Sequence, residues 1–302
     1  MRRILHLCVL YLAATVVSAC KPDELVKTEN IPTAGVRFIN AVPDTGGAFG
    51  MDFRFVDIVE SNAAFRIAFR NNPQTSGGVV ASTGIEYKNA RAGSRHFRIF
   101  LDDTLQSIAS VVLKDSTLNL EADHKYTVLL WGNSRSTGAD RMRLTVIDET
   151  VGDPGNSVAL RVINATGSAL DVSIYAAGNS GPPATPTWTN VGAYSISDYK
   201  GADPQQIRYN VRPAGSATNL FSDALALIGQ AIGTQTSGCT VGLDCEPLPG
   251  TTAKGSAITA IIFPRSVAGS KAPQATSPVN FTVPIASFMW DRRPPRVCTA
   301  GC

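Results

Sequence analysis

The chain has 302 residues, 44% of them hydrophobic and 17% charged, with 26 Gly and 18 Pro. This length leaves room for two domains of ordinary size. Frequent turn formers among hydrophobic residues favour an all-β fold. Lys and Arg number 27 against 24 Asp and Glu. With so small an excess, and no basic run that alternates with aromatic residues, we expect no nucleic-acid partner.

Residues 1–19 have the features of a signal peptide. Arg2 and Arg3 give it a positive start, residues 4–17 are apolar, and Ser18-Ala19 supplies small residues before a cleavage site. The apolar stretch is short for a membrane span, and no later stretch reaches that length. Because the segment carries two Arg and no acid, its removal leaves 25 basic and 24 acidic side chains.

The residues around the expected cleavage site resemble the lipobox of bacterial lipoproteins, with Cys20 after Val-Ser-Ala. The resemblance implies that Cys20 carries two or three acyl chains, palmitate among them, which hold the protein on a bilayer without a span. By the same resemblance, Lys21 in place of Asp implies the outer membrane of the cell envelope and leaves the face open. The alternative is ordinary secretion with an incidental Cys20. Residues 20–35, polar and without periodicity, predict a tether.

Four further cysteines form two close pairs, Cys239 with Cys245 and Cys298 with Cys302. In an oxidising compartment this spacing predicts local disulfides, each pinning one loop. The alternative is a four-thiolate zinc site, which the wide separation of the pairs and the lack of a nearby His disfavour.

One phrase occurs twice: Val-Arg-Phe-Ile-Asn-Ala at 36–41 and Leu-Arg-Val-Ile-Asn-Ala at 160–165. Each copy precedes an alternating run that begins with Asp, at 52–56 and 171–175. We interpret each as the first hairpin of one of two homologous domains. Asn40 and Asn164 stand where a side-chain amide can cap a turn.

The first domain is expected at 36–150. After an insertion of uncertain structure at 58–70, we predict strands at 85–88, 95–101 and 105–113, then a central strand at 125–132 that pairs with 141–147. A linker begins at Glu149.

The second domain is expected at 157–268, and its run 206–211 matches 95–100 while its run 258–263 matches 126–131. Residues 269–302 form a C-terminal tail. We expect its apolar stretch 286–290 to dock as an edge strand, because exposure would favour aggregation.

These phrases, with the strand Tyr-Thr-Val-Leu-Leu-Trp-Gly at 126–132, resemble the bacterial domain-of-unknown-function 4397 family. Members are often lipoproteins or secreted proteins with one or two such domains. The resemblance implies two tandem immunoglobulin- or transthyretin-like β-sandwiches, and it carries over no functional residues. The second copy departs from the pattern at its last strand, where Phe263-Pro264 replaces Trp131-Gly132.

Catalytic patterns are absent from the sequence: no Gly-x-Ser-x-Gly, His-Glu-x-x-His or phosphate-binding loop occurs. His96 lies between arginines and His124 in a polar turn, both poor settings for metal or acid–base chemistry. Asp102-Asp103 is a turn doublet, and Asp140 and Asp148 look isolated. We therefore expect no cofactor, no metal site and no enzyme.

The sequence favours a non-catalytic, lipid-anchored envelope protein whose β-sandwiches bind an unidentified envelope protein or surface. A carbohydrate-binding module is the alternative, with Trp188, Tyr194 and Tyr199 as candidate ligand contacts that would stack on sugar rings. A third hypothesis is a hidden enzyme whose site lies between the domains.

Overall fold

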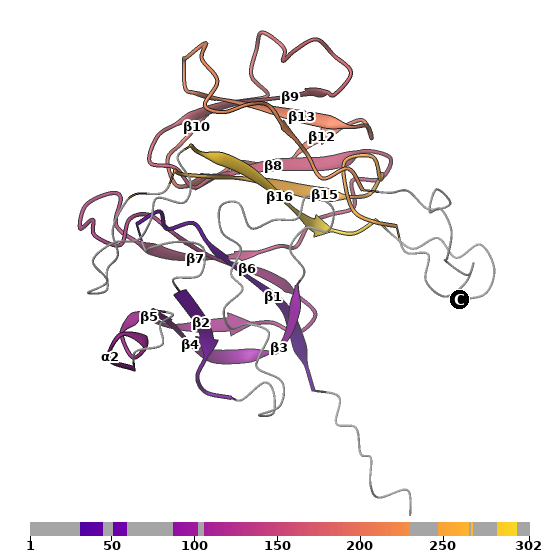
Figure 1. Ribbon diagram of the computed structural model, residues 1–302. Helices are drawn as coiled ribbons and strands as arrows, with labels where there is room; N and C mark the ends of the chain where they lie inside the picture. The colour runs from indigo at the N-terminus through magenta and orange to yellow at the C-terminus, as the bar shows by residue number, and fades with distance from the viewer. Residues whose placement is uncertain are drawn as a thin grey trace, which may run out of the picture. The chain divides into compact units, whose positions relative to one another are not determined.

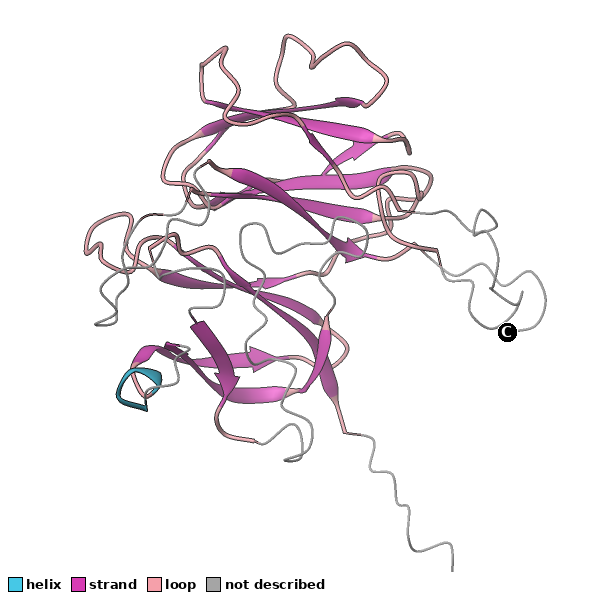
Figure 2. Cartoon of the chain, viewed as in Figure 1, coloured by secondary structure: helices cyan, strands magenta, loops and turns pink. Residues whose placement is uncertain are grey.

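The computed structural model describes residues 31–44, 51–58, 87–101, 106–229, 247–265, 267 and 283–294. The described chain is all-β apart from one helical turn, α2 (Gln106–Ala109) (Figures 1 and 2). Its strands are β1 (Thr33–Asn40), β2 (Met51–Phe55), β3 (Lys88–Arg91), β4 (Gly93–Leu101), β5 (Val112–Leu120), β6 (Lys125–Trp131), β7 (Arg143–Asp148), β8 (Val158–Asn164), β9 (Leu170–Ala176), β10 (Trp188–Val191), β11 (Ser195–Ile196), β12 (Lys200–Ala202), β13 (Ile207–Pro213), β14 (Ala224–Leu225), β15 (Ala257–Phe263) and β16 (Ile285–Arg292).

The strands form four sheets that share two cores. In the first sheet pair, sheet β3-β1-β6-β7 and sheet β2-β4-β5 enclose one apolar cluster. In the second sheet pair, sheet β11-β8-β15-β16, with β12 also on β8, and sheet β10-β9-β13-β14 enclose another. Phe38 anchors the first core, since its ring stacks on Phe97 at 5.4 Å and meets Phe53 edge-on at 5.5 Å.

The repeated phrase lies at the centre of each sheet pair. β1 pairs in parallel with β6, and β8 pairs in parallel with β15. Both strands are buried on both faces, which explains their nearly continuous apolar sequence. Registers match as well: Arg37 lies opposite Thr127, and Arg161 lies opposite Thr259.

The hairpin interpretation of the repeated phrase is wrong. β1 and β2 belong to different sheets, as do β8 and β9, so the chain crosses from one sheet to the facing one after each Asn-Ala. The asparagines cap these crossings, as the sequence predicts. The Val42 amide donates to Asn40 Oδ1 at 3.1 Å, and the Thr166 amide donates to Asn164 Oδ1 at 2.9 Å.

The predicted strand at 105–113 is also wrong. Residues 106–109 form α2, and β5 begins at Val112. Within β5, buried and exposed side chains alternate near its end: Leu118 and Leu120 are buried, whereas Thr117 and Asn119 are exposed. The central strand β6 and its partner β7 match the prediction. Apart from Ile58, the 58–70 insertion lies outside the described residues.

Residues 285–292 form β16, which pairs antiparallel with β15 at the edge of its sheet. Ile258 lies opposite Trp290 and Ala257 opposite Arg292, so Asp291 is the additional residue of a β-bulge. Arg292 is the last residue of this strand. Arg292 donates to the Gly255 carbonyl and pairs with Asp153 at 3.1 Å.

Replacing Asn164 by Ala should lower the free energy of unfolding by about 2–3 kcal/mol, because buried hydrogen-bonding groups lose their partner. Asn164 is fully buried and its amide donates to three carbonyls, those of Ser168, Val191 and Gly192, at 2.8–3.0 Å. Urea denaturation checks this. Asn156→Ala is the control, since Asn156 is exposed and its Oδ1 accepts a 3.3 Å bond from Lys254. Equal losses in the two variants would contradict the capping role.

Candidate functional site

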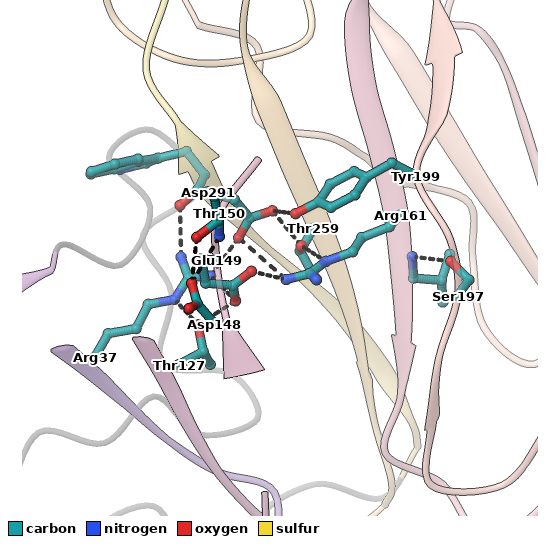
Figure 3. Close-up of polar contacts among 12 residues, drawn as sticks. Arg37, Thr127, Asp148, Glu149, Thr150, Arg161, Ser197, Tyr199, Thr259 and Asp291 are labelled. Atoms are coloured by element: carbon teal, nitrogen blue, oxygen red, sulfur yellow. Dashed lines mark hydrogen bonds and ion pairs between the residues drawn. The ribbon is translucent and has the colours of Figure 1, made fainter. Parts of the chain in front are cut away.

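The most unusual feature of the described chain is a group of charged side chains buried between the two sheet pairs (Figure 3). Arg37 on β1 and Arg161 on β8 reach toward Glu149, directly after β7, and Asp291 in the bulge of β16. The side chains of Arg37, Glu149 and Asp291 are 0% exposed, and that of Arg161 is 6% exposed. We call these four residues the buried charge cluster.

Each carboxylate is shared by arginines from both sheet pairs. Arg37 Nη2 donates to Glu149 Oε1 at 3.2 Å and to Asp291 Oδ1. Arg161 Nη2 donates to Glu149 Oε2 and lies 3.7 Å from Asp291 Oδ1. Arg37 Nη1 also donates to the Trp290 carbonyl at 2.6 Å. The charges therefore join β1 and β7 of one sheet pair to β8 and β16 of the other.

A threonine hydroxyl bridges each arginine to a carboxylate by hydrogen bonds. Arg37 Nε donates to Thr127 Oγ1 at 2.7 Å, and that hydroxyl donates to Glu149 Oε1 at 2.5 Å. Arg161 Nε likewise donates to Thr259 Oγ1 at 2.7 Å, and Thr259 donates to Asp291 Oδ2. Charge-assisted bonds of this kind fix direction as well as proximity.

A tyrosine covers each guanidinium. Arg37 lies over the Tyr87 ring at 4.5 Å, and Arg161 lies over the Tyr199 ring at 4.7 Å. The Tyr199 hydroxyl donates to Asp291 Oδ2 at 2.7 Å. The rings withhold water from the cations and supply a favourable π face.

Burial dominates the electrostatics of the cluster. It raises the pKa of Glu149, an effect that the nearby Asp291 carboxylate reinforces and the two arginines oppose. Burial alone would lower the pKa of Arg37, but Tyr87, Asp291 and Glu149 together raise it. Burial, then Asp291, raises the pKa of Tyr199 well above its usual range. Both arginines are thus held charged by their partners.

An apolar cluster, also made by both sheet pairs, extends this interface. Ile39 and Leu129 come from the first sheet pair, and Ile163 and Ile261 from the second. All four are fully buried. Because neighbouring residues on a strand face opposite ways, β1 gives Val36 and Phe38 to the first core and Arg37 and Ile39 to this interface. The charged groups of the buried charge cluster bond to one another and to neighbouring threonine, tyrosine and backbone groups. The cluster therefore serves to hold the two sheet pairs together.

The three aromatic residues predicted to contact a ligand lie among packing contacts. Trp188 is 5% exposed, belongs to the second core, and donates to the Asp198 carbonyl at 3.1 Å. Tyr194 is half-buried beneath Arg143, and Tyr199 covers Arg161. The rings share no exposed platform, so their role in ligand contact stays a prediction without support from these contacts.

Both histidines of the described chain pair with carboxylates on the surface. His124 Nδ1 lies 2.9 Å from Asp148 Oδ2, and His96 Nε2 lies 2.7 Å from Asp115 Oδ1. The interpretation of Asp148 as isolated is wrong. Asp148 at the end of β7 lies opposite Tyr126 at the start of β6, next to the turn that contains His124. The Asp148 carboxylate, which accepts a hydrogen bond from the His124 ring, raises the pKa of His124. Among the described residues, no three His, Cys, Asp or Glu side chains gather closely enough to hold a metal ion.

The predicted lipidation site Cys20 and the predicted disulfide residues Cys239, Cys245, Cys298 and Cys302 lie outside the described residues. Their roles stay predictions. Within the described part of the chain, no helix has the length and apolarity that crossing a bilayer requires.

Another buried arginine holds the edge of the first sheet pair. Arg95 is 1% exposed, donates to both carboxylate oxygens of Asp57 at 3.0 and 3.1 Å, and lies over the Phe55 ring. Burial of Asp57 opposes ionisation, but bonds from Arg95 and from the His96 amide lower its pKa to about 2.

Comparison with known proteins finds one family whose model matches part of the chain. Residues 34–175 match the model of the family described as "Domain of unknown function (DUF4397)". This match supports the resemblance read from the sequence, and it runs past Glu149 through β8 and most of β9. No curated protein matches the chain.

Among solved structures, the chain is similar to one from Bacteroides fragilis NCTC 9343 described as a "putative cell adhesion protein". The alignment covers 89% of this chain and 100% of that chain at 12% identity, with a TM-score of 0.20. A likeness this low carries no argument about fold or function.

Sequence reasoning did not predict the buried charge cluster, although the repeated phrase contains both of its arginines. The matched positions of Arg37 and Arg161, and of Thr127 and Thr259, were visible in the repeat. The carboxylates were missed: Glu149 was assigned to the linker, and Asp291 is placed by a bulge that no periodicity shows. One signal in the sequence could have indicated the carboxylates. An arginine stands at the same place in two otherwise apolar strands, and a buried arginine requires a buried counter-ion.

Replacing Arg37 by Met or Asp291 by Asn should each lower the free energy of unfolding by ~3–5 kcal/mol, because each leaves an uncompensated buried charge. The double variant should lose less than the sum of the two, since the residues contact each other. Chemical denaturation followed by tryptophan fluorescence measures all three. Arg98→Met, which removes a 38% exposed partner of Asp115, should stay within about 1 kcal/mol; additive losses would refute the pairing.

The Asp57 carboxyl should titrate with a midpoint near pH 2, as its pKa implies. The folded pKa lies below the ordinary value of 3.8, so the stabilisation by Asp57 is complete above that value and lost as the pH falls toward 2. Carboxyl-carbon NMR of the folded protein checks this. In Arg95→Met the midpoint should move up toward 3.8, and an unchanged midpoint would contradict the role of Arg95.

Proposed function

We propose that this chain is a non-catalytic, lipid-anchored protein of the cell envelope that presents β-sandwich domains for binding a protein or surface. The observation that supports this proposal most directly is that the recurring polar side chains make structural contacts within the fold. Arg37, Arg161, Asn40 and Asn164, which both copies of the phrase supply, are engaged in the buried charge cluster and in turns. These groups hold the fold together, so binding would fall to surfaces that differ between the copies.

The matched connectivity supports a tandem duplication. In both sheet pairs the repeated phrase forms a central strand, pairs in parallel with a later apolar strand, and borders a short antiparallel strand that follows a tyrosine, β3 after Tyr87 and β12 after Tyr199. Each sheet pair is then one immunoglobulin- or transthyretin-like sandwich, and a gene that duplicated one sandwich would produce this order.

The loop between β9 and β10 is a candidate contact region. Residues 178–180 and 182–185 in this loop are exposed. Exposed loops on a rigid scaffold commonly carry binding specificity. The proposed partner is an envelope protein or a surface component.

Replacing Cys20 by Ala should move the protein from the membrane fraction to the soluble fraction, because acyl chains supply the attachment. Fractionation of cells followed by immunoblotting measures this. Cys8→Ala is the matched control, since Cys8 lies within the segment expected to be removed, and it should leave the protein in the membrane fraction. Membrane retention of the Cys20 variant would contradict the anchor.

Crosslinking in intact cells, followed by purification of the chain, separates the proposed protein partner from a glycan partner. A specific protein adduct that disappears when residues 178–185 are replaced by a Gly-Ser loop of equal length supports the proposal. Binding to a glycan array without any protein adduct would replace it with the carbohydrate-binding alternative.

A further inference from the structure

The interface between the two sheet pairs is built from equivalent positions on its two sides (Figure 3). In the strand registers, Arg37 opposite Thr127 corresponds to Arg161 opposite Thr259. Directly after β7 and within β16, a carboxylate accepts a hydrogen bond from the threonine of its own sheet pair. The set Arg37, Thr127 and Glu149 of the first sheet pair therefore corresponds, residue by residue, to the set Arg161, Thr259 and Asp291 of the second.

The charged contacts across this interface are reciprocal. Arg37 lies closer to Asp291 than to Glu149, and Arg161 lies closer to Glu149 than to Asp291. Each arginine thus makes its shorter ion pair with the carboxylate of the other sheet pair. Exchanging the two sheet pairs would turn one of these contacts into the other. Such reciprocity is the mark of an isologous interface, the kind that joins two identical subunits about a two-fold axis.

The apolar contacts at the interface follow the same rule. Equivalent positions of both sheet pairs meet in one apolar cluster: Ile39 and Ile163, Ala41 and Ala165, Leu129 and Ile261, Trp131 and Phe263, and Ile147 and Met289. Within the described part of this cluster, Tyr194 and Ile196 are the members without such a counterpart. The face of each sheet pair therefore presents nearly the same arrangement of apolar and charged groups as the face that it meets.

A single segment of chain connects the sheet pairs. Strands β1 to β7 belong to the first sheet pair and β8 to β16 to the second, so the connection is residues 149–157. None of the residues 150–157 is buried. Each sheet pair also encloses an apolar core of its own. Separating the sheet pairs would therefore uncover the interface and redirect an exposed segment, while both cores stay enclosed.

We propose that this face is a pairing surface that also fits a second copy of this chain. In the two-chain assembly, the first sheet pair of each chain joins the second sheet pair of the other, which forms two copies of the interface and leaves no face uncovered. A second copy fits because a face that is complementary to its counterpart in one chain is complementary to the same counterpart in another. The inference rests on contacts within the chain and does not depend on the proposed envelope function.

Two charge-reversal variants test exchange between chains. Arg37→Glu leaves one arginine with three carboxylates in the buried charge cluster, and Asp291→Arg leaves three arginines with one carboxylate. Either variant alone has an unbalanced interface, whether it closes within one chain or between two identical chains. A complex of one chain of each kind has two arginines and two carboxylates in both interfaces, one with the native contacts and one with the charges exchanged.

The measurement uses the chain from Lys21 onward, which contains the whole compact unit Thr33–Cys302, in reducing buffer so that no disulfide joins chains. The two variants are unfolded, mixed and refolded together, and native mass spectrometry counts the chains of each kind in every complex. The one-to-one complex should be at least tenfold more abundant than the dimer of either variant alone. Folded variants that stay monomeric in the mixture would overturn the proposal.

The matched control exchanges charges within a single sheet pair. Arg98 and Asp115 form a 2.7 Å ion pair between β4 and β5, both in the first sheet pair. Exchange of sheet pairs between chains cannot restore this pair, so mixing Arg98→Glu with Asp115→Arg should give no complex beyond that of each variant alone. A one-to-one complex of equal abundance in this control would contradict a surface specific to the interface.

The wild-type chain provides an arm that does not depend on whether the variants fold. When it is refolded at rising protein concentration, light scattering after size exclusion should show a growing fraction of a two-chain complex. Refolding an equal mixture of unlabelled and ¹⁵N-labelled chains should place both kinds in that complex. Wild type that refolds as a monomer at every concentration would overturn the proposal, whatever the variants do.

Discussion

The arrangement of the two sheet pairs depends on two buried guanidinium groups that share two buried carboxylates. Removing four charges from water is costly, and attraction between them offsets the cost only when each donor and acceptor is well placed. The apolar contacts around Ile39 and Ile163 tolerate small shifts, since the hydrophobic effect has no direction. The bonds from Arg37 and Arg161 do not. The charges therefore define the register of the interface, and the apolar residues supply contact area.

This constraint explains features that look unrelated in the sequence. Glu149 must lie at the end of β7, so the connection between the two copies starts inside the interface. Asp291 must point toward Arg37, and the bulge in β16 provides that direction by adding one residue opposite β15. The last strand therefore completes a site that begins at the first strand, although 254 positions separate the partners.

The sequence was sufficient for what repeats and periodicity encode. The repeated phrase, the apolar run at 126–131 and the turn asparagines led to the all-β fold and the central strands. It was not sufficient for pairing between sheets. A crossing from β1 to β2 and a hairpin share one local signature, an alternating run, a turn and another alternating run, and only the core contacts that form on folding decide between them. For the same reason, Glu149 and Asp291 could not be matched to their arginines.

The polar residues that recur in the repeated phrase are those that hold the two sheet pairs together. Arg37 and Arg161 occupy the same place in the phrase and share Glu149 and Asp291 at the interface, so recurrence here marks residues that join the two sheet pairs. Lys125 and Trp290 do not recur: by register, Lys125 opposite Gly35 corresponds to Ala257 opposite Ala159, and Trp290 opposite Ile258 corresponds to Asp148 opposite Tyr126. Neither side chain belongs to the buried charge cluster. A change at such a position leaves the bonds of Arg37 and Arg161 to Glu149 and Asp291 in place, so it can alter surface chemistry while the fold is kept.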